Sequence, residues 1–356
     1  MRRVPATNKK YFIIAPAVII VALLVVFFAP WTGAAGGTRI DIRMVDADGP
    51  GFTFADNVIT ITRNGNFVIT GATNIRRIVV QSGLVDVNIT LSDVDINLGT
   101  RRYAAFLVRS GAEVNLTLAG DNTFTSGGVG LGILGDATLV ITRNSRGSLT
   151  TTSAYGPGIG ALIQADTGGR GSIIIYGGTI MAAGGSYGDL HGWPGIGGGG
   201  NITIGGNADV TATGGNGRYG GAAGIGGATG GNSGNITITD AASVTAVGGD
   251  GLADRGGGFA HVPITNGGGA GVGSGGGFSQ FSPGSSRWSK RGLFETVVIN
   301  NTGRQDFRGG GGYFSGANVG TGGGFWRDAS GRGFSSSGEQ YALDGSGPVF
   351  PRPPSH

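Results

Sequence analysis

Downstream of about residue 57 the chain is a succession of short segments in which apolar and polar residues alternate. Helical spacing does not persist over any useful window after Gly37, because glycine and β-branched residues interrupt it. Alternation with a period of two is typical of β-strands that bury one face. These segments fall into repeats, and each repeat begins with one such strand. We expect one apolar residue of that strand to be buried in each repeat, and these residues, called anchors, are Leu116, Leu139, Ile173, Ile202, Ile236 and Val297.

Two further elements complete each unit. A second strand follows a tight turn, and its predicted inward residues are Phe124, Leu149, Ile180, Val210 and Val244. A third, shorter element places one apolar residue among glycines: Ile159, Ile196, Ile225, Val272 and Val319. Three short strands per repeat predict an all-β, right-handed parallel β-helix, a solenoid of about eight coils stacked ~4.8 Å apart.

The composition supports this interpretation and excludes others. Glycine accounts for 78 of 356 residues, but proline accounts for only 12 and glycine has no period of three, so the chain is not collagen. With 39% apolar and 13% charged residues it lacks the signature of a disordered chain. Glycine suits the corners, where the backbone turns and neighbouring coils pack closely. Because cysteine is absent, disulfides, thiolate metal sites and cysteine nucleophiles are excluded.

The first 35 residues predict export. Residues 11–31 are uncharged and apolar, follow four basic residues, and are long enough to cross a ~30 Å hydrocarbon core. They form either an N-terminal membrane anchor or a signal peptide cleaved at Ala35, where Gly33 and Ala35 supply the small side chains that a signal peptidase accepts. In both cases the rest of the chain would be extracellular or at the cell surface. Beyond residue 35 there are 21 basic and 21 acidic residues. The basic surplus therefore belongs to the targeting segment, and nucleic acid is not an expected partner.

The expected domain boundaries follow from these patterns. Residues 36–56 would cap the amino end, and residues 57–324 would form the β-helix, with long insertions at 248–294 and 300–315. Residues 325–356 form a tail, first rich in glycine and aromatic residues and then in proline, which we expect to be partly disordered.

From Asn57 to Gly324 the recurring strings RIVVQSG, GAEVNLTLAGDNTF, GDATLVIT, GNITI, VTATGG and GxGIGGG carry a family resemblance. The chain resembles bacterial surface proteins of the right-handed β-helix, pectate-lyase-like superfold, in particular the carbohydrate-binding domain-containing repeat proteins. The resemblance implies a non-catalytic surface protein that binds a polysaccharide or a cell-surface glycan, or acts as an adhesin. Two alternatives remain: a lyase or hydrolase of uronic-acid polymers, and a structural filament or envelope subunit that self-associates end to end.

Candidate binding residues are aromatic or lie beside aromatic residues, because sugar rings stack on such side chains. They are His191 and Trp193 in GDLHGWPG, Tyr219, and two tryptophans of the aromatic-rich carboxy-terminal region, Trp288 and Trp326. The strings that mark polygalacturonase active sites are missing, and no catalytic residue is predicted.

The alternation suggests two further sites. Alternation places Asp93 and Asp95 on one face, which would allow a calcium site, with solvated carboxylates as the competing interpretation. No other cofactor is predicted. Outward positions of the second strands, Thr125, Thr150, Met181, Thr211 and Thr245, form a threonine ladder. A regular ladder of this kind would indicate ice binding, but Met181 interrupts it.

Overall fold

The structure, a computed structural model, describes residues 37–161, 171–187, 190–252, 264–266, 268–282, 285–289, 296–311, 317–320, 324–327 and 333–336. These residues are all-β and contain no helix. The chain divides into two compact units, Met1–Gly37 and Thr38–His356, and every strand named below belongs to the second. Residues 11–31 lie outside the described ranges. The described residues contain no helix that is long and apolar enough to cross a membrane.

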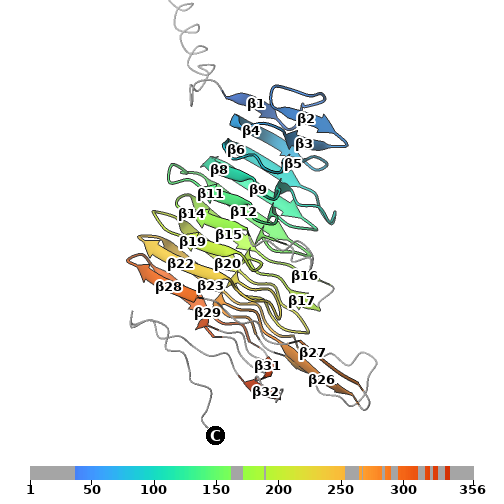
Figure 1. The fold of residues 1–356 in the computed structure, drawn as a ribbon, viewed down its shortest axis with the longest axis vertical. Coiled ribbons are helices and arrows are strands. Elements are labelled where there is room, and N and C mark those ends of the chain that lie inside the picture. Colours follow the sequence, from blue (N-terminus) through green and yellow to red (C-terminus); the bar gives the residue numbers. More distant parts are fainter. Residues whose placement is uncertain are drawn as a thin grey trace, which may run out of the picture. The chain divides into compact units, whose positions relative to one another are not determined.

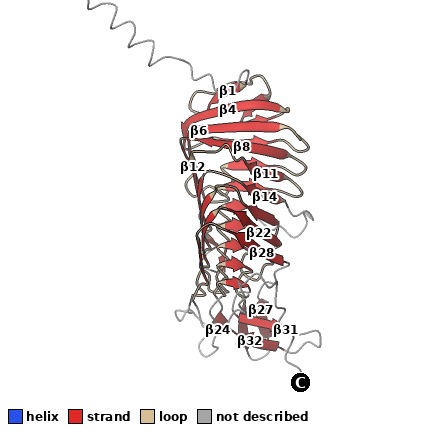
Figure 2. Ribbon diagram, turned by 90° about the vertical axis from the view of Figure 1, so that its left-hand side faces the viewer, coloured by secondary structure: helices blue, strands red, loops and turns tan. Residues whose placement is uncertain are grey.

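A fifteen-stranded sheet has two halves, here called the first and second columns. The first column contains β1 (Thr38–Asp41), β4 (Gly65–Thr73), β6 (Val87–Asn97), β8 (Glu113–Ala119), β11 (Thr138–Ile141), β14 (Ser172–Ile175), β19 (Asn201–Ile204), β22 (Asn235–Asp240) and β28 (Thr296–Asn301). All of these strands pair in parallel, and Figures 1 and 2 show them stacked in chain order.

The second column contains β9 (Asp121–Ser126), β12 (Ser148–Ser153), β15 (Thr179–Ala183), β20 (Asp209–Thr213), β23 (Ser243–Val247) and β29 (Gln305–Arg308), again in parallel. The long strand β6 joins the columns, since its residues 87–92 pair with β8 and its residues 95–97 pair with β9.

A separate ten-stranded sheet is the third column. It contains β2 (Phe52–Ala55), β3 (Val58–Ile61), β5 (Arg77–Val80), β7 (Phe106–Val108), β10 (Leu131–Ile133), β13 (Ile159–Gly160), β18 (Ile196–Gly197), β21 (Ile225–Gly226), β25 (Val272–Gly273) and β30 (Val319–Gly320). Only β2 runs antiparallel to its neighbour. From β8 onward each repeat visits the first, second and third columns in that order, which is compatible with a solenoid.

The predicted ladder of apolar residues in the third element is confirmed. Ile159 pairs with Ile196, Ile196 with Ile225, Ile225 with Val272, and Val272 with Val319. All five side chains are buried. The regular apolar core therefore arises from equivalent residues of successive repeats, as the alternation predicted.

Two predicted inward residues, Leu116 and Phe124, are each shifted by two positions along the strand relative to the neighbours expected beside them. Leu116 pairs with Ile141, so the residue level with Leu139 is Val114. In the second column the buried residue level with Leu149 is Asn122, and Phe124 stands beside Thr151. A shift of two residues keeps every side chain on the same face of a strand, so alternation alone does not determine which inward residue is level with which.

Asn122 is accommodated at its inward position because its side-chain amide forms hydrogen bonds with backbone groups of the neighbouring repeats. Its Oδ1 accepts a hydrogen bond from Val94 N at 3.0 Å, and its Nδ2 donates to Ser148 O at 3.0 Å. The side chain is 1% exposed and connects three successive repeats. A buried amide with satisfied polar groups is tolerated where an unpaired one would be destabilising.

The remaining strands lie outside the columns or at their ends. Antiparallel pairs are formed by β16 (Ser186–Tyr187) with β17 (His191–Gly192), by β26 (Phe278–Ser282) with both β24 (Ile264–Asn266) and β27 (Ser285–Ser289), and by β31 (Gly324–Arg327) with β32 (Gly333–Ser336). Residues 38–55, predicted as a cap, supply an end strand to each large sheet. Residues 305–308, predicted within an insertion, form β29 and pair with β23.

Candidate functional site

The turns between the second and third columns bring basic and aromatic side chains together. Because the strands on both sides are paired in register, the turns that connect them also lie one above another. In the repeats from β6 to β21 these turns contribute Arg102, Tyr155, Tyr187, His191 and Tyr219. We call these five residues the aromatic stripe.

Arg102 connects two tyrosines from later repeats. Its guanidinium carbon lies 4.9 Å from the ring centre of Tyr155 and 5.4 Å from that of Tyr187. The two rings meet edge to face, with centres 6.2 Å apart. Tyr187 is 45% exposed, so its ring is available at the surface. A guanidinium over a tyrosine face is attracted by the ring quadrupole, which helps to fix the positions of all three side chains.

Arg102 can reach Tyr155 because two glycines in the intervening turn have no side chain to block the contact. The intervening turn, between β9 and β10, contains Gly127 and Gly128, and an added Cβ at these positions would lie 2.3 Å from Thr100 O and 2.6 Å from Tyr103 O. This turn therefore packs closely against the turn that carries Arg102, and has no side chain at these two positions.

The hairpin β16–β17 continues the stripe. Tyr187 pairs directly with His191 across the hairpin, so both side chains project from the same face of the hairpin. The His191 ring then meets the Tyr219 ring edge to face, with centres 5.1 Å apart. Partial burial lowers the pKa of His191, which favours the neutral imidazole near pH 7. His191 thus gives the stripe a neutral imidazole that can both donate and accept a hydrogen bond.

A separate cation–aromatic pair precedes the stripe. The Arg77 guanidinium carbon lies 4.9 Å from the ring centre of Tyr103, which is 58% exposed. The pKa of Arg77 is lowered, chiefly by burial and next by the positive charge of Arg109. Tyr103 follows Arg102 directly in sequence, so the pair neighbours the stripe.

The structure brings together two of the predicted binding residues, His191 and Tyr219. Trp193 follows the hairpin and is half-buried, and its indole N–H is buried without a hydrogen-bond partner. Trp288 and Trp326 lie in strands β27 and β31, but their side chains are outside the described part of the structure.

The sequence analysis missed Arg102, Tyr155 and Tyr187. The available signal was positional: each lies in the turn that follows a second-column strand, and comparing these turns from repeat to repeat would have grouped them.

The predicted carboxylate pair lies at a bend. Asp93 has φ of +56°, and it stands where β6 passes from the first to the second column. The alternation is interrupted between Ser92 and Asp93, but Asp93 and Asp95 are both exposed on either side of the buried Val94. The Asp93 carboxylate accepts a hydrogen bond from Asp121 N at 3.1 Å. Within the described ranges no group of three or more His, Asp or Glu side chains is arranged to hold a metal ion.

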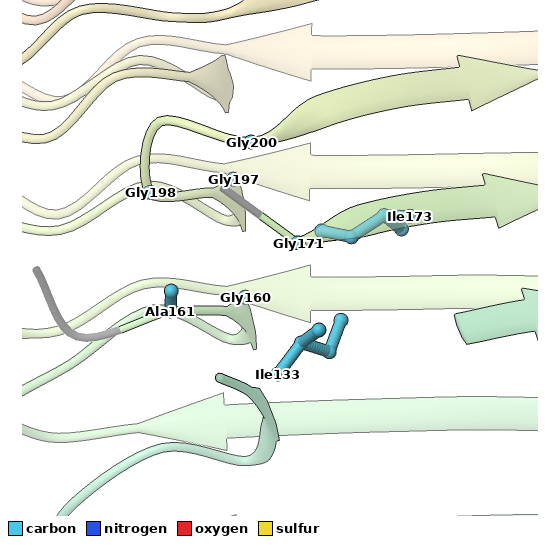
Figure 3. Close-up of a pocket in the computed structure, with 8 residues that line it drawn as sticks. All are labelled: Ile133, Gly160, Ala161, Gly171, Ile173, Gly197, Gly198 and Gly200. Atoms are coloured by element: carbon cyan, nitrogen blue, oxygen red, sulfur yellow. The ribbon is translucent and has the colours of Figure 1, made fainter. Parts of the chain in front are cut away.

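A small cavity beside the third column is lined by apolar residues and glycines. Figure 3 shows its lining, which consists of Ile133, Gly160, Ala161, Gly171, Ile173, Gly197, Gly198 and Gly200. None of these side chains is polar or titratable, so the cavity offers neither an acid nor a base. The aromatic stripe is the better candidate for a binding site.

The chain matches no protein-family model, and neither a curated protein nor a solved structure is significantly similar to it.

Proposed function

We propose that the protein is an exported, right-handed parallel β-helix that binds carbohydrate without catalysis along the aromatic stripe. The observation that carries this proposal is the clustering of five side chains from turns of four repeats: Arg102, Tyr155 and Tyr187 are in contact, His191 and Tyr219 are in contact, and Tyr187 pairs with His191 across the hairpin. The apolar run at residues 11–31 supports export of the region that follows it.

The chemistry of the stripe suits sugars. Tyrosine rings present an apolar face and a polar hydroxyl, and they keep a rigid shape at low entropic cost. Arg102 and His191 add hydrogen-bond donors beside the tyrosine rings, and sugar hydroxyls need such partners. Repeats stack at about 4.8 Å, close to the length of one sugar residue in an extended polysaccharide. A linear glycan lying along the stripe would therefore run past the turns of several repeats and meet side chains from each turn that carries one.

The test is a polysaccharide and oligosaccharide array probed with the full chain in a non-ionic detergent, with and without calcium. The variant Tyr187→Ala should lower apparent affinity at least about ten-fold, equivalent to ~1.4 kcal/mol. Tyr176→Ala is the matched control, because Tyr176 also packs under an arginine, with Arg143 5.6 Å from its ring centre, but follows a first-column strand.

The proposal requires that the control bind like the wild-type chain. Absence of binding to every glycan would refute carbohydrate recognition. Equal loss of affinity in the Tyr187→Ala and Tyr176→Ala variants would show that the stripe is not the site.

A further inference from the structure

Part of the outward face of the second column, on β9, β12, β15, β20 and β23, is an ordered array of small uncharged side chains. In β12, β20 and β23 the inward residues Leu149, Val210 and Val244 are fully buried, so the residues between them point outward. The face is open to solvent: Met181 of β15 is 47% exposed, and Thr152, Thr211 and Thr213 are also exposed.

The strand register places the outward residues of these five strands in three rows. The row at the start of the strands contains two carboxylates, and it consists of Asp121, Ser148, Thr179, Asp209 and Ser243. The other two rows, here called the first and second rows, contain no charged residue. The first row is Thr123, Thr150, Met181, Thr211 and Thr245. The second row is Thr125, Thr152, Ala183, Thr213 and Val247. The sequence analysis had placed Thr125 in line with Thr150, and this was wrong, since the residue level with Thr150 is Thr123. With this register seven of the ten positions are threonine, and the other three are Met181 and Ala183 on β15 and Val247 on β23.

The array has a fixed geometry. Neighbouring strands lie about 4.8 Å apart, and alternate residues of one strand about 6.6 Å apart. Threonine is β-branched and has few χ1 rotamers, so each methyl and hydroxyl group repeats on this two-dimensional grid with little freedom. We call the ten residues of the two rows the threonine face.

The chemistry of the threonine face is unsuited to most partners. Its ten residues include no charged or aromatic side chain, whereas charged residues normally make up about a quarter to a third of a protein surface. Charged residues lie at its borders, with Asp121 and Asp209 in the adjoining row and Asp306 and Arg308 on β29. A polyanion would require Arg or Lys, and a sugar platform would require aromatic rings. Face-to-face packing with a second copy would require larger apolar side chains to fill the ~10 Å between sheets.

What remains is a partner that is itself a periodic lattice of hydroxyl groups. We propose that the threonine face binds the surface of ice. Regularly spaced hydroxyl groups hold water molecules by hydrogen bonds, and the methyl groups between them restrict where those waters lie. A rigid grid of this kind orders a layer of water that can join the lattice of a growing crystal. This activity is separate from glycan binding, because the aromatic stripe lies on the turns that follow these strands.

The test measures thermal hysteresis and inhibition of ice recrystallisation by the full chain in a non-ionic detergent, with detergent alone as the blank. The wild-type chain should shape ice crystals and slow recrystallisation at concentrations where the blank does neither. Thr211→Lys, in the middle of the first row, should raise the concentration needed by about ten-fold.

Two further variants make the test independent of misfolding. Thr203→Lys is the matched control, because Thr203 points outward from β19 in the first column, and it should leave the activity within about two-fold of wild type. The double variant Met181→Thr/Ala183→Thr makes the first row all threonine, leaves Val247 as the one other residue in the second row, and should increase the activity.

Absence of ice activity in the wild-type chain, or equal losses in Thr211→Lys and Thr203→Lys, would overturn the proposal. So would a dimer in sedimentation analysis that Thr211→Lys dissociates, since the face would then be covered by a second copy.

Discussion

Replacing Gly197 by alanine tests how closely successive repeats approach. Gly197 follows the ladder residue Ile196, has φ of +144°, and an added Cβ would lie 2.0 Å from Gly226 O in the next repeat. The backbone conformation alone disfavours alanine by roughly 1–3 kcal/mol. The collision is with backbone rather than with a flexible side chain, so it forces neighbouring repeats apart, and overpacking of this kind costs about 1–3 kcal/mol more. We therefore expect Gly197→Ala to lose about 2–6 kcal/mol of unfolding free energy.

Gly65→Ala is the matched control. Gly65 has nearly the same φ, +141°, but nothing lies within 4 Å of an added Cβ. This variant should show the conformational cost alone, about 1–3 kcal/mol. The assay is urea unfolding of the full chain followed by circular dichroism, comparing midpoints at unchanged slope. Equal destabilisation by the two substitutions would refute the close approach of repeats at Gly197.

The remaining predictions use the same unfolding assay. Ile196→Ala removes one member of the apolar ladder and should cost about 2–5 kcal/mol; a cost below about 1 kcal/mol would contradict its place there. Asn122→Leu leaves Val94 N and Ser148 O without their hydrogen-bond partner, at about 1–3 kcal/mol for each buried group. Burial lowers the pKa of His191 below its ordinary ~6.5. Its contribution to stability should therefore be complete above about pH 6.5 and decline as pH falls toward the folded-state pKa, and His191→Gln should abolish that part of the pH dependence.

The apolar pattern predicted the parallel strands and the ladder in the third column, because that element holds a single apolar residue per repeat. With only one candidate, Ile159, Ile196 and their equivalents could not be misaligned. The first and second strands carry two or three inward residues each, and a shift of two leaves burial unchanged. This is why Leu116 and Phe124 were aligned with the wrong neighbours, and why the second row of threonines was not recognised.

The candidate site was harder to predict from the sequence than the fold. Trp193, His191 and Tyr219 were chosen for their chemistry alone, and only His191 and Tyr219 are in contact. Arg102 lies 53 residues before Tyr155 in the chain, and they meet only because the turns are stacked and the intervening turn holds glycines. Contacts of this range depend on register, which local alternation does not specify.

Disulfide formation tests the stacking of repeats most directly, and the chain suits it because it has no cysteine of its own. Thr211 and Thr245 are paired on neighbouring strands. Their Cα atoms are expected about 4.8 Å apart, within the ~4.4–6.8 Å that a disulfide spans. Thr150 and Thr211 lie in the same row but two strands apart, beyond this range. Under mild oxidation the Thr211→Cys/Thr245→Cys variant should form an intramolecular disulfide and the Thr150→Cys/Thr211→Cys variant should not; crosslinking of the second and not of the first would contradict the stacked register.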